Sequence, residues 1–556
     1  MADISRVLYT AKEALLSNLT AINVTGANIA NVNTPGYSRL RPMFESVGTK
    51  DASSAQEQIG VRIADVERIY DRFLESQIIA QQSSVENYTA QQDSLSSIEG
   101  ILNENNGGGI NDALSEFLNA WGNLSVEPSS ISKRDTVVST GQNLAYIFNQ
   151  RAEDIENVQI AANDSIADTV SILNSDLQLI AEYNKSIVSA ESAGTSASSI
   201  RDKRAELLKK ISGMIDINYM EKSDGSLYIS LPTNGKALVE GFKSWELQVK
   251  RNTGNNNLYD IVFKEDPSES INDQITGGKL AGLLEVRDNT IPSYLDQLNQ
   301  TASSIINKVN EMHISGYDQD GNPGESFFIS TAQAKYMQVS AQIVADTRKI
   351  AASATVNADG DNATAITAIQ SDKMYASIEM GASSHTVTGQ ITNIGQTYKD
   401  STTITLTRGL TSTASDWTVS NGGYSSMAIL TADDRMVTLD LNNDAQADIR
   451  LNLTGTWSNG ETITFKLTKS GNTTNIDGYF NAFIASVGQD VDNASQSLTS
   501  MTAILNQQTD QRDQLSGVSL DEEMMNLIKY QMAYGAAGRM TSTVNELMDI
   551  LINLGR

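Results

Sequence analysis

The side chains that most often carry chemistry in proteins are scarce or poorly spaced in this sequence. Two histidines are present, His313 and His385, and neither belongs to an H-x-x-x-H or H-E-x-x-H pattern. The absence of cysteine excludes thiolate metal ligands, disulfides and a cysteine nucleophile. A G-x-S-x-G nucleophile elbow is also missing. The sequence therefore predicts no metal centre, no catalytic residue and no cofactor.

Acidic side chains are the remaining candidates, since the chain has 67 Asp and Glu against 40 Lys and Arg. Pairs at glycosidase spacing are not excluded by counting, but in so acidic a chain most pairs belong to a solvated face. Residues 318–322 and 440–444 resemble parts of calcium loops. Ala445 stands where an EF-hand loop needs glycine, and neither segment has the glutamate at position 12. We interpret both as Asx-rich turns.

The net charge and the hydropathy pattern limit the partners that the chain can have. A formal net charge of -27 repels nucleic-acid phosphates and anionic membranes. No stretch approaches the ~18 consecutive apolar residues of a membrane span. The first residues, MADISR, lack the charged region and apolar run of a cleaved signal peptide. We expect no nucleic-acid partner, no membrane insertion and no cleaved signal.

An amphipathic helix is predicted at the start of the chain, over residues 4–32. Its apolar side chains recur at steps of three and four, at Ile4, Leu8, Ala11, Leu15, Leu19 and Ile22. Asp3 is the predicted N-cap. Thr34, Pro35 and Gly36 should end the helix, because proline disfavours helical geometry in the preceding residue and glycine permits a turn.

A second terminal helix is predicted from residue 519 onward. Ser519 and Glu522 form an S-x-x-E capping box, and the acidic first turn complements the helix dipole. Gly555 follows the last periodic position. The apolar stripe comprises Met524, Leu527, Met540, Val544, Leu547, Leu551 and Leu554.

Between the ends, long helical runs alternate with two insertions of strand periodicity. Helical seams are predicted within residues 74–102, 155–187 and 291–312. Residues 225–263 and 371–469 show period two with Gly- and Asn-rich turns. The predicted fold class is mainly α with β insertions: a terminal coiled coil, a long-helix bundle and two outer β-rich domains. The predicted domains are 1–45 with 516–556, then 60–212 with 285–345 and 476–515, then 213–284, and finally 346–475.

Two segments at opposite ends of the chain resemble signatures of flagellar axial proteins, the rod, hook and hook-associated family. The first is residues 28–39, NIANVNTPGYSR, where three asparagines crowd a helix end at a local energetic cost. The second is residues 520–534, LDEEMMNLIKYQMAY. Residues 60–63, 66–74, 200–208, 275–284 and 316–324 are similar to the first hook-associated protein of that family. The resemblance covers 1–345 and 476–556 and fails over 346–475.

The resemblance implies a structural subunit without enzymatic activity, located outside the cell at the hook–filament junction and required for motility. It implies flagellar type III export without a cleaved signal and assembly through both terminal helices. The implied partners are further copies of the chain in a ring, the hook protein, the second junction protein (hook-associated protein 3), an export chaperone and the export apparatus. The implied assembly motif is Asn28, Asn31, Asn33, Thr34, Pro35, Gly36 and Tyr37. The implied C-terminal assembly and chaperone helix uses Ser519, Glu522, Met524, Leu527, Ile528, Tyr534, Val544, Leu547 and Leu551.

Two alternatives stay open at this point. One is another axial protein of the hook or rod type, although those proteins turn to β structure soon after the first motif and are generally shorter. The other is a junction protein whose outer insertion acts as an adhesin or a hydrolase. Within residues 346–475 no catalytic constellation of acids, histidines or metal ligands is apparent, which favours a structural role.

Overall fold

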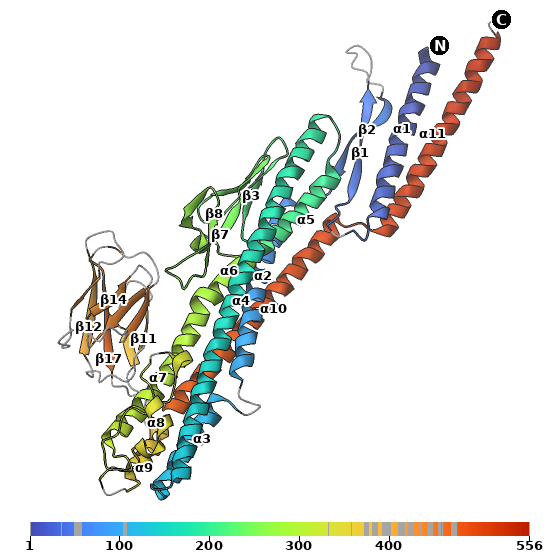
Figure 1. Cartoon of the computed structure of the whole chain (residues 1–556). Coiled ribbons are helices and arrows are strands. Elements are labelled where there is room, and N and C mark those ends of the chain that lie inside the picture. The colour runs from blue at the N-terminus through green and yellow to red at the C-terminus, as the bar shows by residue number, and fades with distance from the viewer. Residues whose placement is uncertain are drawn as a thin grey trace. The chain divides into compact units, whose positions relative to one another are not determined.

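The computed structural model describes residues 2–34, 36–48, 58–103, 108–331, 333–356, 359–371 and 475–554, with the strands and adjoining residues between 377 and 468. These residues are mainly helical, with strands inserted between long helices (Figure 1). The predicted fold class is therefore confirmed. The chain folds into two compact units: Met1–Gln91, Asn163–Leu284 and Ala494–Arg556 form the first, and Gln92–Ala162 and Glu285–Asn493 the second. The four predicted domains and their boundaries stay a prediction.

The first unit contains the terminal helices. Helix α1 (Ala2–Ala30) and helix α11 (Leu520–Leu554) run side by side, with the hairpin of β1 (Leu40–Gly48) and β2 (Gln58–Arg68) next to α1 (Figure 1). The hydroxyl of Ser17 donates to the carbonyl of Val61, 3.0 Å away, which ties α1 to β2. Because α1 already begins at Ala2, Asp3 lies inside its first turn, and the predicted N-cap role of Asp3 is wrong.

The rest of the first unit is built from longer helices and a β-rich segment. Its helices are α5 (Ser198–Met214), α6 (Gly278–Glu285) and parts of α2 (Arg72–Leu102), α4 (Ile131–Ser192) and α10 (Ile476–Ser516). Helix α6 approaches α2 so closely that a Cβ on Gly282 would lie 2.3 Å from the carbonyl oxygen of Asn87. Only glycine fits this contact, which explains a glycine inside this helix.

The β-rich segment contains two antiparallel sheets with strand orders β3-β4-β5-β6 and β7-β8-β9. The strand periodicity predicted for residues 225–263 corresponds to strands β4 to β8. The strands are β3 (Asn218–Glu221), β4 (Leu227–Ser230), β5 (Ala237–Glu240), β6 (Lys243–Ser244), β7 (Leu247–Arg251), β8 (Tyr259–Phe263) and β9 (Asp266–Ser270), followed by η1 (Asn272–Gln274).

The second unit has an aromatic core and an outer β-rich part. Its own helices are α3 (Ile110–Val126), η2 (Val286–Thr290), α7 (Ile291–Ser315), η3 (Ala334–Tyr336), α8 (Ala341–Ala345), η4 (Thr347–Lys349), α9 (Asp361–Thr367) and η5 (Ala368–Ser371). Its strands are β10 (Ser377–Met380), β11 (Val387–Ile391), β12 (Thr402–Arg408), β13 (Trp417–Ser420), β14 (Ala428–Ala432), β15 (Met436–Asp440), β16 (Ile449–Leu453) and β17 (Thr462–Thr468). The strand orders are β10-β17-β12-β13 and β11-β16-β15-β14.

The residues that first suggested chemistry have structural roles in this unit. His313 lies in the last turn of α7 and is fully buried against Trp121 and Phe327. Its Nδ1 contacts the carbonyl of Glu325, and its Nε2 accepts a hydrogen bond from the backbone N–H of Ala351 at 2.9 Å. Burial lowers the pKa of His313 to about 4, so the ring is neutral. His385 lies outside the described residues.

The Asp-rich segment at 318–322 is a turn, as interpreted from the sequence. Asp318 Oδ1 accepts the backbone N–H groups of Asp320 and Asn322 at 2.9 and 2.8 Å. These bonds occupy the oxygen that a cation would need. Within the described residues no group of three or more His, Asp or Glu could hold a metal ion, and no described helix is long and apolar enough to cross a membrane. Of the second segment, Asp440 is described as buried, and residues 442–444 lie outside the described part.

Candidate functional site

The two signature segments meet at the base of the α1–α11 pair, and Asn28 is the centre of this contact. Its side chain is 1% exposed and is saturated with hydrogen bonds. Nδ2 donates to Glu523 Oε2 at 3.0 Å and to the carbonyl of Leu40 at 2.9 Å. Oδ1 accepts from the Tyr37 hydroxyl and from the Leu40 N–H, both at 2.9 Å. One buried amide therefore joins α1, the turn after it, β1 and α11. We call these residues, with Arg39, the clasp.

Arg39 closes the clasp from the side of the turn. Its Nε donates to Glu523 Oε1 at 2.8 Å, and its outer nitrogens lie 2.7 Å from Glu523 Oε1 and from Glu522 Oε2. The backbone N–H of Arg39 also donates to the carbonyl of Ser516, at the end of α10. Glu523 is 2% exposed. The ion pair with Arg39 and the hydrogen bond from Asn28 offset the desolvation cost of burying its carboxylate.

The electrostatics of the clasp keep the Tyr37 hydroxyl protonated. Burial, together with the nearby carboxylates of Asp202 and Glu523, raises the pKa of Tyr37 to about 12. Tyr37 is therefore a hydrogen-bond donor to Asn28 across the physiological pH range. Asp202 itself pairs with Arg68 across 2.6 Å, at the end of β2.

The turn after α1 is shaped by the other residues of the predicted assembly motif. Asn31 donates to the carbonyl of Ala27 and accepts from the Thr34 hydroxyl at 3.2 Å. Gly36 has a φ of +74°, and a Cβ there would lie 2.2 Å from Cγ of Glu206 in α5. Asn33 is exposed, and Pro35 lies outside the described residues. The motif thus divides into buried clasp residues, turn residues and one exposed asparagine.

At the start of α11 the predicted capping box is only half present. The Oγ of Ser519 is 3.5 Å from the Glu522 N–H, a long contact. The Glu522 carboxylate accepts from Arg39, so the return bond of the box is replaced by an ion pair with the turn. The residue that matters most at this helix start is the neighbouring Glu523, which the sequence treated only as part of an acidic first turn.

The seam between α1 and α11 is lined by small and polar side chains. On α11 it follows steps of seven, at Glu523, Tyr530, Ala537 and Val544, of which Ala537 and Val544 are 7% and 4% exposed. The buried side chains of α1 are Ala11, Ser17, Asn18, Ala21, Val24, Thr25 and Asn28. Small residues let the two helices approach closely.

Many of the large apolar side chains of the two terminal helices lie outside this seam. Leu16 and Leu19 of α1 are 50% and 44% exposed. On α11 the exposed side chains are Leu520, Met524, Met525, Ile528, Met532, Tyr534, Met540, Leu547 and Ile550. The residues of the predicted α11 stripe therefore do not share one buried face. Val544 is in the seam and Leu527 is half-buried, while Met524, Ile528, Tyr534 and Leu547 are exposed. The Leu551 side chain lies outside the described residues.

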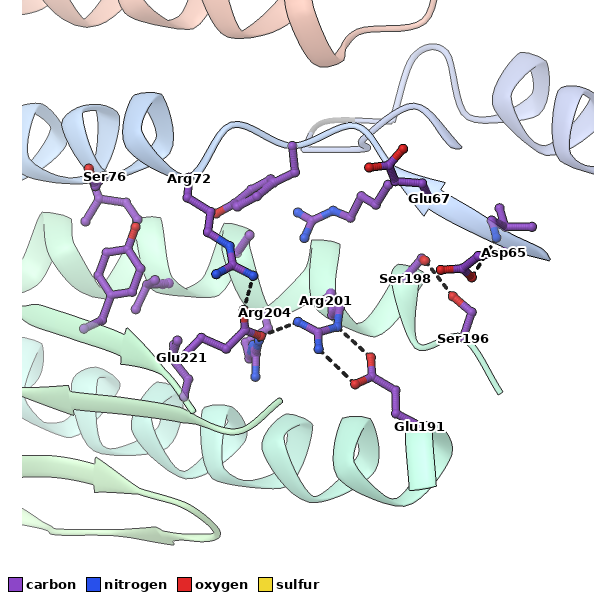
Figure 2. Close-up of a pocket in the computed structure, with 18 of the residues that line it drawn as sticks. Asp65, Glu67, Arg72, Ser76, Glu191, Ser196, Ser198, Arg201, Arg204 and Glu221 are labelled. Atoms are coloured by element: carbon purple, nitrogen blue, oxygen red, sulfur yellow. Dashed lines mark hydrogen bonds and ion pairs between the residues drawn. The ribbon is translucent and has the colours of Figure 1, made fainter. Parts of the chain in front are cut away.

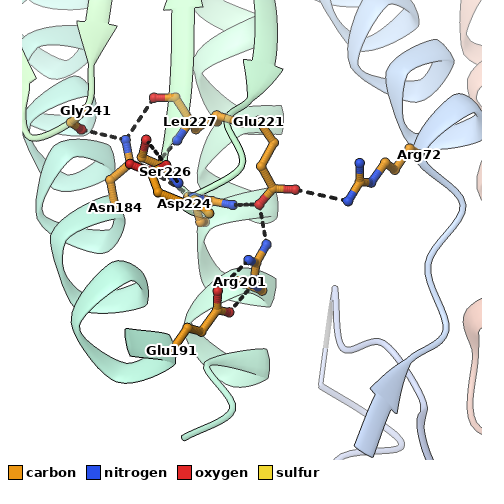
Figure 3. Close-up of polar contacts among 11 residues, drawn as sticks. Arg72, Asn184, Glu191, Arg201, Glu221, Asp224, Ser226, Leu227 and Gly241 are labelled. Atoms are coloured by element: carbon orange, nitrogen blue, oxygen red, sulfur yellow. Dashed lines mark hydrogen bonds and ion pairs between the residues drawn. The ribbon is translucent and has the colours of Figure 1, made fainter. Parts of the chain in front are cut away.

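A polar cleft of about 960 Å³ lies beside the clasp, between the end of β2, the starts of α2 and α5, and β3 (Figure 2). Its carboxylates are already paired. Glu221 contacts Arg204 at 2.7 Å and Arg72 at 3.4 Å and also pairs with Arg201, which holds Glu191 in turn (Figure 3). Burial alone would raise the pKa of Glu221, but Arg201 and Arg204 outweigh it and lower that pKa.

This cleft anchors the β-rich segment rather than offering an acid for catalysis. Asn184 of α4 donates to the carbonyls of Leu227 and Gly241 and accepts from Arg204 and from the Leu227 N–H (Figure 3). A general acid needs a raised pKa, whereas Glu221 is held ionised by its partners.

Comparison with known proteins gives a consistent assignment along the chain. Residues 95–328 match the model of the flagellar hook-associated protein FlgK helical domain. Residues 8–37 match that of the flagella basal body rod protein, and residues 511–554 that of the flagellar basal body rod FlgEFG protein C-terminal region. The terminal matches fall on the two segments that the clasp joins, and the FlgK match favours the hook-associated branch over the hook or rod type.

Relatives that align with nearly the whole chain support the same assignment. The chain is 27% identical to flagellar hook-associated protein 1 of Bacillus subtilis (strain 168), covering 98% of this chain and 97% of the relative. It is 23% identical to that of Escherichia coli (strain K12), covering 99% and 100%. The structure of the flagellar hook junction protein FlgK from Burkholderia pseudomallei shares the fold, with a TM-score of 0.51 and 18% identity over 79% of this chain and all of that one. The chain is therefore similar along nearly its whole length to flagellar hook-associated protein 1 (FlgK).

Proposed function

We propose that this protein is a structural subunit of the bacterial flagellum that joins the hook to the filament and assembles through its two terminal helices. The similarity to flagellar hook-associated protein 1 supports the flagellar role. The observation that carries the mode of assembly is the α1–α11 pair. It is locked at its base by Asn28 and Glu523 and leaves its large apolar side chains exposed.

The distribution of side chains in this pair is the reverse of what an isolated helical hairpin needs. A two-helix unit is normally stabilised by large apolar side chains in its seam. Here the seam consists largely of alanines and polar residues, with Val544 among the few large apolar side chains. Leu16, Met525, Ile528 and Met532 are half-exposed or more. Exposed apolar surface of this kind marks a contact with another protein. We assign that contact to neighbouring subunits around the flagellar axis.

The partners follow from this assignment. We propose that further copies of the chain, the hook protein and the second junction protein (hook-associated protein 3) cover the exposed faces after assembly. Before export through the flagellar type III apparatus, a cytoplasmic chaperone would cover α11. Its amphipathic face suits capture of a helix in a groove. The mature location is the extracellular junction between hook and filament.

We also propose that the protein has no enzymatic activity. Within the described residues, Glu191 and Glu221 of the polar cleft are paired with arginines, and the described histidine is buried and neutral. Neither arrangement offers a group ready to move a proton.

Two isoleucines provide a matched test of assembly through α11. Ile528 and Ile172 lie on helices and are 50% and 49% exposed. Each is replaced by glutamate, and each variant is expressed in a strain that lacks the native gene. We expect Ile528→Glu to abolish filament growth and motility while leaving the helical circular dichroism unchanged, because a charge would enter the docking face. Ile172→Glu should restore motility. Equal motility of the two strains would contradict the proposal.

A further inference from the structure

Methionine is the only oxidisable sulfur in this chain, and it is concentrated in α11. The sequence has no cysteine and 16 methionines. Five of them, Met524, Met525, Met532, Met540 and Met548, lie in this one helix of 35 residues out of 556. An even distribution would place about one methionine there, so the helix is enriched roughly fivefold over background composition.

Four of these methionines are exposed outside the α1–α11 seam. Met525 and Met532 are 64% and 67% exposed, and Met524 and Met540 are 55% and 40% exposed. Met525, Ile528 and Met532 are spaced by three and four residues, which places them on one side of the helix. The seam residues Ala537 and Val544 are buried against α1 on another side. Met525 and Met532 therefore lie on the face that the proposed function assigns to neighbouring subunits, and Met524 and Met540 are exposed on its two flanks.

A second copy of this chain supplies a complementary surface for this face. The same helix pair exposes a second apolar surface, Leu16 and Leu19 of α1. A contact of α11 from one copy with α1 of the next is heterologous, and contacts of this kind build rings when the rotation between copies closes and open helical assemblies when it does not. Methionine suits such a contact because its flexible, polarisable side chain adapts to neighbours of different shape.

We propose that Met524, Met525, Met532 and Met540 are oxidative modification sites and that their oxidation in the free subunit prevents α11 from docking. Hydrogen peroxide transfers one oxygen atom to the thioether sulfur. The S–O bond forms as the O–O bond breaks, the sulfur loses two electrons, and the peroxide is reduced to water. The sulfoxide is polar and cannot pack against an apolar face without desolvation. Docking in turn covers these sulfurs, so assembled subunits resist the oxidant. This inference rests on the proposed assembly through α11.

The reactivity part is tested on the intact purified chain. After a short peroxide treatment, mass spectrometry of peptides quantifies the sulfoxide at each methionine. The four α11 methionines and the exposed Met220, which is 60% exposed in the β-rich segment, should react at least tenfold faster than Met337 and Met214. Met337 and Met214 are 1% and 9% exposed and serve as internal controls. Equal rates at all these positions would overturn the proposal.

The docking part compares two variants on hooks purified from a strain that lacks this protein. Peroxide treatment should lower binding of the native chain to hooks at least tenfold, and methionine sulfoxide reductase should restore it. A variant with the four α11 methionines changed to leucine should bind and be insensitive to peroxide, whereas Met220→Leu should stay sensitive. Unchanged binding of the oxidised native chain would contradict this inference but leave the proposed function intact. If the untreated chain also fails to bind hooks, the proposed function fails with it.

Discussion

Asn28 and Glu523 are 495 positions apart in the sequence, yet Asn28 Nδ2 donates to Glu523 Oε2 across 3.0 Å in a site from which solvent is almost excluded. This bond links the two terminal segments that match flagellar rod-protein models. It fixes the end of α1 against the start of α11, so it sets which faces of the two helices meet and which stay exposed.

The clasp should fail locally when Asn28 is shortened. Asn28→Ala removes the hydrogen bond to Glu523 Oε2 and both bonds to the backbone of Leu40, and Glu523 keeps only its pair with Arg39. We expect the local opening free energy to fall by about 2–4 kcal/mol. Hydrogen exchange of the Leu40 amide and of the first turns of α11 measures this loss. Asn33→Ala, at an exposed position of the same motif, should leave exchange unchanged, and equal exchange in both variants would refute the role of Asn28.

Glu523 should matter more than its neighbour Glu522. The Glu522 side chain is 55% exposed and its pair with Arg39 is worth at most about 1 kcal/mol. Glu523→Ala leaves Arg39 and Asn28 facing an empty buried site, and we expect a loss of about 3–5 kcal/mol in local stability. Limited proteolysis near residues 516–520 reports the opening. A larger effect of Glu522→Ala would show that the predicted capping box, rather than the clasp, organises this helix start.

Glycine at position 36 should be required for two separate reasons. Alanine there adopts an unfavourable backbone conformation and collides with the side chain of Glu206. Gly36→Ala should destabilise the turn by about 1–3 kcal/mol from the backbone strain alone, with the collision adding to it. Gly36→Ala combined with Glu206→Ala should recover only the part due to the collision. The matched control is Gly26→Ala in α1, where a Cβ meets nothing within 4 Å. Its thermal stability should equal or exceed that of the native chain.

The aromatic core of the second unit should become less stable in mild acid through His313. Burial lowers its folded-state pKa to about 4 from the ordinary 6.5. Between these values the unfolded chain binds a proton and the folded chain does not. This contribution to stability is therefore complete above pH 6.5 and is lost as the pH falls toward 4. The full loss is about 3 kcal/mol.

Hydrogen exchange around residues 327 and 351 between pH 7 and 4 tests this prediction, after correction for the intrinsic pH dependence of exchange. His313→Gln removes the titrating ring, so its pH dependence should be shallower than that of the native chain at the same positions. Parallel pH profiles for the two proteins would contradict this role of His313.

Most elements could be predicted because their signals are local. Apolar spacing located both terminal helices, and period two located the strands within residues 225–263 and 371–469. The β1–β2 hairpin was not predicted, and it turns the chain to β structure soon after the first motif, which had been expected only of hook and rod proteins. The family signatures located the assembly segments. The Asp3 cap and the Ser519–Glu522 box were predicted from the same kind of local rule. In the structure α1 begins before Asp3, and only the Ser519 half of the box is present.

Which side chains of α1 and α11 are buried between the two helices, and which are exposed, could not be predicted in the same way. An apolar stripe on one helix implies a partner but does not say which partner covers it. Leu16, Leu19 and Met525 had the composition of a core, yet α1 and α11 meet through Ala21, Ala537 and Val544 instead. In the sequence, Glu523 is one of several acidic residues in the first turn of the helix. Only its hydrogen bonds from the distant Asn28 and from Arg39 Nε distinguish it from Glu522.

The most direct test of assembly through the terminal helices is a cryo-EM map of the hook–filament junction from native flagella. The account predicts this chain in a layer between hook and filament, with α1 and α11 next to the axis. It also predicts that Met525, Ile528 and Met532 are covered by a neighbouring subunit. A map in which these three side chains face open solvent, or in which the chain is absent from the junction, would contradict it.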